Sequence, residues 1–152
     1  MLVFVPVASA DLAAWASGEV LSDADAFAPT AAFLDAFGLS APDEEDAERT
    51  LTYLAGLVAL QRHGHRLVAV AEAPLGAEGD DEWGRVRVSL PFSHVSALFA
   101  DDPDAAAQVA SVRAVVQDLS LDEAWSAPAH ERLLADADLM WFGPEEWSQL
   151  VG

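Results

Sequence analysis

The sequence predicts an α+β fold: a small mixed, mainly antiparallel sheet with helices packed mostly on one face, as in a two-layer sandwich. Three observations support this class. Residues 43–63 carry two adjoining apolar stripes at helical spacing, which predicts one long, central helix. Several short apolar or alternating segments are typical of strands. The order of elements is strand–helix, helix, long helix, two strands, helix, and a final strand–helix pair.

The composition predicts a single domain that covers residues 1–152. The chain has 53% hydrophobic and 22% charged residues, which is typical of a globular protein. It shows no internal repeat and no linker rich enough to separate two domains. The absence of cysteine excludes disulfides, thiolate nucleophiles and Cys-ligated zinc, and it is consistent with a cytoplasmic location.

The charge of the chain restricts its partners. The formal net charge is −19, and all seven basic residues are arginine. Such a field repels phosphate backbones, so we expect no nucleic-acid binding, whereas a basic protein or a cation would be attracted. No apolar stretch approaches the roughly 20 residues of a membrane span, so we expect no membrane insertion. The opening "MLVFVPVASAD" imitates a signal-cleavage site but has no basic start, and we interpret it as a buried strand.

Local patterns define the elements before the long helix. We expect a strand at Leu2–Val7 and a helix that begins at Ser9 and ends near Gly18. The stretch "LSDADAFAP" is typical of a loop, with a short extended piece at Ala26–Ala28 before Pro29. Thr30 is a candidate N-cap for a short helix that Gly38 ends.

The elements after residue 43 follow from caps and alternation. The acidic run in "SAPDEEDAE" opens the long helix, where the helix dipole favours anions, and Gly64 ends it. Arg85–Leu90 alternates apolar and polar residues, which is typical of a strand covered on one face. The other expected elements are a strand at Leu67–Ala73, a helix or strand within Phe92–Ala100, a helix capped by Asp102, and a helix at Pro128–Asp136.

The tail "DLMWFGPEEWSQLVG" has both aromatic and acidic residues, and two readings compete for it. Leu139–Phe142 is apolar on both faces, which predicts an interior strand with Trp141 in the core. Gly143 supplies a turn, and Pro144–Val151 then predicts a closing helix with acids in its first turn. An aromatic cage for a cation would need rings that converge around an open face. We therefore favour the structural reading.

The most concentrated positive charge lies on one predicted strand face, at Arg85 and Arg87. If Leu67–Ala73 pairs with Arg85–Leu90, Arg66 and Glu72 become neighbours of these arginines. Guanidinium groups in register can hold a carboxylate or phosphate, so Arg66, Arg85 and Arg87 form the candidate ligand-binding set. The competing interpretation is that they make ordinary exposed ion pairs with the many carboxylates.

Other chemical motifs are weak. His63 and His65, with His94 or Glu72, could ligate a metal, but arginines flank the pair and would disfavour a dication. We therefore expect neither a metal nor a cofactor. The acidic loop "GAEGDDEWG" lacks phosphate-loop spacing and a lysine, so we interpret it as a hairpin connection. Short acidic pairs elsewhere are typical of caps and turns, and no catalytic residue can be assigned.

Four segments carry a resemblance to a known family. They are "LVFVPV" at the start, "AFAPT" before a helix, "RVRVSLP" in the middle and "LMWFGPEEWSQLVG" at the end. With these the chain resembles an uncharacterised actinobacterial protein family over nearly its whole length. The resemblance implies a single domain in a cytoplasmic setting, and it implies no activity, cofactor or site residue.

These observations lead to three functional hypotheses, the third of which is an acidic decoy that sequesters a basic nucleic-acid-binding protein and binds it in a salt-sensitive way. The first is a non-enzymatic cytoplasmic domain with an acidic surface that binds a small ligand or a protein partner, or forms a homodimer through a half-exposed sheet. The alternative is an enzyme or sensor for a small anion, built on Arg85 and Arg87 with Arg66. Convergence of the three guanidinium groups in one pocket would favour the alternative.

Overall fold

A computed structural model describes residues 1–74 and 79–151 and confirms the α+β class. The six-stranded sheet has the order β4-β2-β1-β3-β5-β6, and each pairing of the described strands is antiparallel. The strands are β1 (Leu2–Pro6), β2 (Leu21–Phe27), β3 (Leu67–Glu72), β4 (Arg85–Leu90), β5 (Val95–Ala100) and β6 (Met140–Phe142). The helices are α1 (Ser9–Ala16), α2 (Ala31–Ala36), α3 (Glu44–His63), α4 (Ala106–Val116), α5 (Leu121–Trp125) and α6 (Pro128–Asp136). The described residues also form the 3₁₀ helices η1 (Ala41–Asp43), η2 (Phe92–His94), η3 (Pro103–Ala105) and η4 (Pro144–Leu150).

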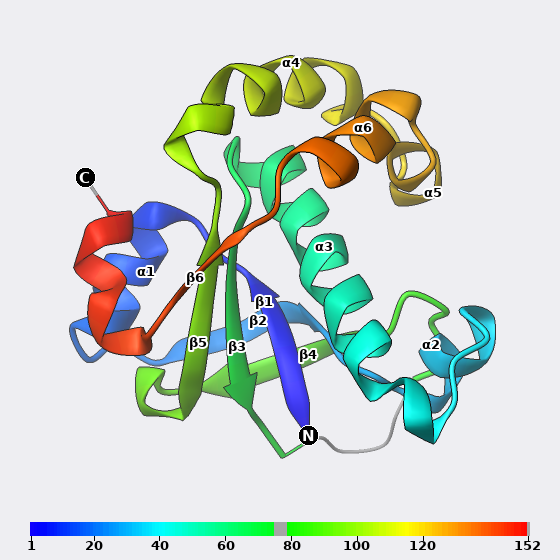
Figure 1. Ribbon diagram of the computed structural model, residues 1–152. Helices are drawn as coiled ribbons and strands as arrows, with labels where there is room; N and C mark the ends of the chain where they lie inside the picture. Colours follow the sequence, from blue (N-terminus) through cyan, green and yellow to red (C-terminus); the bar gives the residue numbers. More distant parts are fainter. Residues whose placement is uncertain (75–78, 152) are drawn as a thin grey trace.

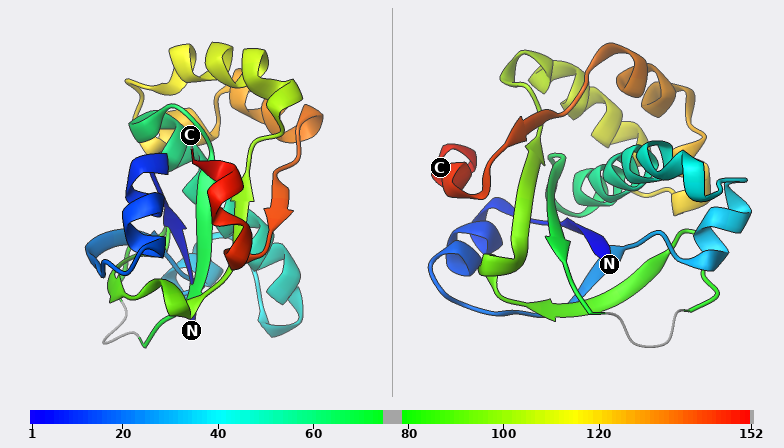
Figure 2. Two further views of the ribbon diagram at one scale, coloured as in Figure 1. Left: turned by 90° about the vertical axis from the view of Figure 1, so that its left-hand side faces the viewer. Right: turned by 60° about the horizontal axis from the view of Figure 1, so that its bottom comes forward.

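Most of the helical mass lies on one face of the sheet, as the sequence predicts. Helix α3 crosses that face, and α4, α5 and α6 lie beyond it (Figure 1). The opposite face has a second, smaller core, where α1 and η4 cover the sheet (Figure 2). There the indole of Trp15 is buried and its Nε1–H donates to the carbonyl of Leu90 at 2.9 Å. The sheet is therefore covered unequally on its two sides.

Helix α3 is the central element because it is apolar around much of its girth. Its buried residues run almost without interruption from Leu51 to Leu60. Three acids occupy its first turn, and Arg62 and His63 occupy its last, so both ends match the helix dipole. Gly64 ends the helix at φ 85°, a left-handed conformation that glycine adopts at little cost. None of the helices in the described ranges is both long and apolar enough to cross a bilayer.

The segment "LSDADAFAP" corrects one expectation, because it forms strand β2 rather than a loop. This strand lies between β1 and β4, and the pairing buries Ala26 and Phe27. Its register shifts between Leu21 and Ala24, and Asp23 there adopts a positive φ of 49°. Strand propensity depends on neighbours, so pairing on both sides outweighs the unfavourable serine and aspartates.

The last strand corrects a second expectation, because β6 lies at the edge of the sheet rather than in its interior. Its paired neighbour is β5, and Trp141 and Met140 remain 60% and 41% exposed. The closing segment η4 packs as expected, with Trp147 and Leu150 against the smaller core. The predicted hairpin between β3 and β4 is also wrong, because β3 lies between β1 and β5. Part of its connection, residues 75–78, lies outside the described residues.

Candidate functional site

Arg66 is buried and has a structural partner. Its Nε donates to Asp101 Oδ1 at 2.7 Å, and its backbone N–H donates to the other carboxylate oxygen at 2.8 Å. Its Nη2 donates to the carbonyl of Ala137 at 3.1 Å. The guanidinium group therefore ties the start of β3 to the end of β5 and to the segment that leads into β6.

Arg85 and Arg87 lie on β4, at the opposite edge of the sheet from β6. Arg87 pairs with Asp25 at 3.3 Å and with Asp23 at 3.6 Å, and Arg85 lies 3.8 Å from Asp81. Strands β2 and β1 separate β4 from β3, so the pairing that would have brought Arg66 to these residues does not form. The three candidate arginines do not share one pocket.

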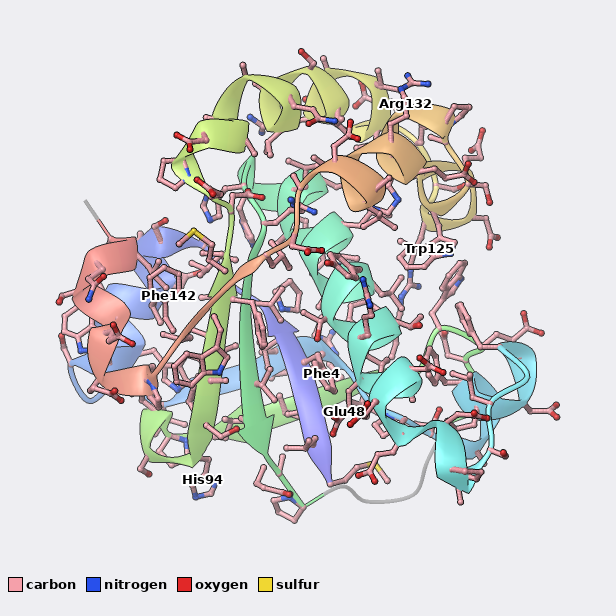
Figure 3. The ribbon with its side chains drawn as sticks, in the orientation of Figure 1. Phe4, Glu48, His94, Trp125, Arg132 and Phe142 are labelled. Atoms are coloured by element: carbon pink, nitrogen blue, oxygen red, sulfur yellow. The ribbon has the colours of Figure 1, made fainter. Side chains whose placement is uncertain are left out.

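The histidines do not assemble a metal centre within residues 1–74 and 79–151, where no group of three or more potential ligands converges. The rings of His63 and His65 are 6.4 Å apart and lie next to the start of β3. His94 precedes Val95, which pairs with Ala71 near the other end of β3 (Figure 3). The possible third ligand is thus separated from the pair by the length of a strand.

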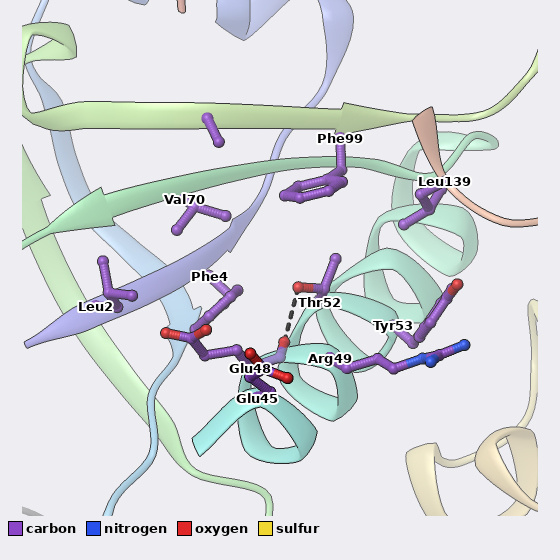
Figure 4. A pocket seen from close by; sticks show the side chains of 11 residues that line it. Leu2, Phe4, Glu45, Glu48, Arg49, Thr52, Tyr53, Val70, Phe99 and Leu139 are labelled. Carbon is purple, nitrogen blue, oxygen red and sulfur yellow. Dashed lines mark hydrogen bonds between the residues drawn. The ribbon is translucent and has the colours of Figure 1, made fainter. Parts of the chain in front are cut away.

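A groove lies between α3 and the sheet on the larger helical face (Figure 4). Its cavity volume is about 390 Å³, within the range of roughly 300–1,000 Å³ that is typical of ligand pockets. The floor is apolar and comes from three neighbouring strands and the segment before β6: Leu2, Phe4, Val70, Ala97, Phe99 and Leu139. The polar side is supplied by α3: Glu45, Glu48, Arg49, Thr52 and Tyr53.

The fold places these polar side chains on one face of α3. Glu45, Glu48 and Thr52 follow one another at spacings of three and four residues, so they line one side of the helix. The hydroxyl of Thr52 donates to the carbonyl of Glu48 at 2.8 Å, which satisfies it within the helix. The hydroxyl of Tyr53 donates to Asp138 at 2.8 Å and so joins α3 to the segment before β6. Polar groups thus form one side of the groove, and the strands form an apolar floor.

The electrostatics of the groove differ between its two ends. Burial raises the pKa of Glu48, and repulsion from Glu44 and Glu45 raises it further. At the other end, Arg49 lies 6.0 Å from the centroid of the Tyr53 ring. Burial and the hydrogen bond to Asp138 raise the pKa of Tyr53, so its phenol stays neutral. One end of the groove therefore has crowded carboxylates, and none of them forms an ion pair within the described residues.

A second hollow adjoins the acidic end of the groove. It shares Leu2 and Glu48 with the groove and continues toward Ser40 and Glu44. The two hollows therefore meet at the N-terminal half of α3, where the acidic residues are concentrated.

One known protein family matches the chain over almost its whole length. The model of a family of unknown function, DUF6912, matches residues 1–151. The chain belongs to this family. No curated protein and no solved structure matches it. The resemblance to an uncharacterised family is thereby confirmed, whereas the actinobacterial origin stays a prediction.

For this DUF6912 chain, the sequence did not reveal the groove. Glu45 and Glu48 matched an ordinary helix start, where acids are expected in any case. The available signal was the spacing of Glu45, Glu48 and Thr52, which places polar groups on one face of a helix that is apolar from Leu54 to Leu60. That spacing indicates a groove only when β1, β3 and β5 are known to lie beneath the helix.

Proposed function

We propose that this protein is a non-enzymatic binding domain whose α3 groove takes the apolar part of a ligand that also carries a cationic group. The observation that carries the proposal is an apolar floor that ends at Glu45 and Glu48, two carboxylates without an ion-pair partner in the described part of the chain. A ligand with matching polarity would bury its apolar part on the floor and place its cation at these acids.

Charge supports a cation rather than an anion at this end. A net charge of −19 raises the local concentration of cations at the surface. A cation beside Glu48 would also relieve the repulsion from Glu44 and Glu45 that raises its pKa. Binding of this kind stabilises the ionised form of Glu48, so we expect affinity to increase as pH rises through the pKa of this residue, above its ordinary value of 4.5.

The groove lining supports binding more than catalysis. The hydroxyl of Thr52 already donates to a backbone carbonyl, and that of Tyr53 donates to Asp138. A nucleophile needs a base within hydrogen-bond reach. The partner of Thr52 is a backbone carbonyl, which is not a base, and the contact with Asp138 raises the pKa of Tyr53 and so keeps its phenol neutral.

The test uses three probes of similar shape and different charge: 4-phenylbutylamine, 4-phenylbutanol and 5-phenylpentanoate. Calorimetric titration at pH 7 should show that the wild type prefers the amine over the neutral alcohol. Glu48→Gln should weaken amine binding by roughly fivefold to tenfold, the effect of removing one charge-assisted contact of about 1–1.5 kcal/mol. Glu19→Gln removes the same charge from an exposed position next to α1 and should change nothing. Equal binding of amine and alcohol would overturn the proposal.

The anion hypothesis has one supporting observation in the same groove. Arg49 is exposed and makes no ion pair with a carboxylate of the described residues. Its guanidinium group could hold a carboxylate whose apolar tail lies on the floor. Stronger binding of 5-phenylpentanoate than of the amine, lost in Arg49→Gln, would favour this second candidate.

A further inference from the structure

Trp141 is the largest exposed aromatic side chain of the described residues, with 60% of its surface open to solvent. Residues that pair directly across antiparallel strands have their side chains on the same face of the sheet. Trp141 pairs with Phe99, which packs on the α3 side and lines the groove. The exposed indole therefore lies next to the groove floor, one strand beyond Phe99.

The apolar floor thus continues to the edge of the sheet. It crosses β1, β3 and β5 and reaches β6, which corresponds to three strand spacings, or about 14 Å. An extended polypeptide covers this distance in about four residues, because each residue advances about 3.3 Å. Alternate side chains of such a segment face the same way, so residues i, i+2 and i+4 would face the floor.

The shape and the exposed tryptophan fit a polypeptide better than a small molecule. Pockets for small ligands bury roughly 70–90% of the ligand, whereas the far end of this groove is an uncovered indole. Tryptophan is among the residues that contribute most to protein–protein interfaces. An exposed indole that continues an apolar groove is therefore typical of a contact for a partner side chain.

The negative charge of the chain favours a basic partner. A second copy of this chain would bring another net charge of −19 to a surface that already has Glu44, Glu45 and Glu48. Acidic partners, nucleic acids and anionic membrane surfaces meet the same repulsion. A basic protein would be attracted both by the overall field and by the acidic end of the groove.

We propose that the α3 groove binds an extended segment of a basic partner protein, with a basic side chain at Glu45 and Glu48 and an apolar side chain on Trp141. This inference rests on the proposed function, because it assumes that the groove is a binding site with a cationic ligand. It adds the class of partner, the direction of the segment across the strands and a second contact residue.

The experiment uses two peptides and ¹H–¹⁵N NMR titration of the full chain. The probe is acetyl-Arg-Ser-Leu-Ser-Leu-amide, and the control peptide has glutamate in place of arginine. The arginine peptide should shift the indole N–H signal of Trp141 and backbone signals near Glu48 and Phe99, and the glutamate peptide should not. Trp141→Ala should weaken the arginine peptide about tenfold. Val115→Ala removes an exposed apolar side chain from α4 and should leave binding unchanged.

The outcomes separate this inference from the proposed function. If Trp141→Ala binds the arginine peptide as tightly as the wild type does, or if neither binds it, the inference is overturned. We expect Trp141→Ala to bind 4-phenylbutylamine as tightly as the wild type does. Binding of this amine therefore tests whether the groove takes a cationic ligand, whatever the result with the peptide. Self-association of the wild type in sedimentation, lost in Trp141→Ala, would show that a second copy covers this surface and would overturn the basic partner.

Discussion

The two edges of the sheet are built in opposite ways. The β4 edge has six residues, and its outward side chains include two arginines in ion pairs with Asp23 and Asp25 on β2 and with Asp81 just before β4. The β6 edge has three residues, Met140, Trp141 and Phe142, and none of them is charged. Charged side chains on an edge strand oppose the addition of another strand, whereas an apolar edge invites contact.

This difference changes how the arginines of the chain are understood. The most concentrated positive charge of the sequence lies on an edge where each guanidinium group already has a carboxylate nearby. That arrangement protects the edge without any ligand. The apolar edge has no such protection in its own strand. It continues the α3 groove, which has a floor of six apolar residues and acids without an ion pair in the described residues. The contrast therefore directs functional tests to β6 and structural tests to β4.

The largest expected effect concerns the buried cation next to the β6 side. Asp101→Ala leaves the guanidinium group of Arg66 buried without its carboxylate, and the side chain of Arg66 is fully inaccessible. Breaking a buried pair from one side typically costs about 3–5 kcal/mol. We expect a loss of this size in the free energy of unfolding, measured by urea denaturation. Asp101→Asn keeps the acceptor oxygen and should lose less. A loss below about 1 kcal/mol, typical of an exposed pair, would show that this ion pair is not buried in solution.

The sequence predicted the elements that local patterns specify. Helix α3 was recognisable from its acids, its apolar stripes and Gly64, and β4 from its alternation. Strand β2 was not recognisable, because serine and aspartate favour loops and only pairing on both sides makes a strand of that segment. Which strands pair is likewise decided by the packing of the whole sheet, and this is why the predicted hairpin failed.

The candidate site was less predictable than the fold. Trp141 looked like a core residue because its strand is apolar on both faces, and that pattern also occurs at an apolar edge. Glu48 looked like part of a helix start, and Arg85 and Arg87 looked like a ligand site. In each case the missing information was the order of the strands. Sequence spacing along one element does not report what lies on the neighbouring element.

A smaller effect is expected at the charged edge. The double variant Arg85→Gln/Arg87→Gln removes three exposed ion pairs, which contribute about 0.2–1 kcal/mol each, so the free energy of unfolding should decrease by no more than about 3 kcal/mol. The difference in free energy of unfolding between the double variant and the wild type should decrease in 1 M salt, because salt screens exposed pairs.

Thermal shifts with phosphate and small carboxylates test the remaining proposal that Arg85 and Arg87 bind an anion. A shift in the wild type that disappears in the double variant would support it.

The smallest expected effect on stability is at Trp141, and it tests directly whether β6 is an open edge. A buried tryptophan such as Trp15 should cost about 3–5 kcal/mol when it is replaced by alanine. Trp141 is mostly exposed, so Trp141→Ala should change the free energy of unfolding by no more than about 0.5 kcal/mol in urea denaturation, the range of surface substitutions. A loss as large as that of Trp15→Ala would mean that the indole packs into the fold and that β6 is not an open edge. A small loss in the free energy of unfolding together with weaker peptide binding would mean that Trp141 does not stabilise the fold. An exposed indole of this kind is expected when its contacts are made with a partner.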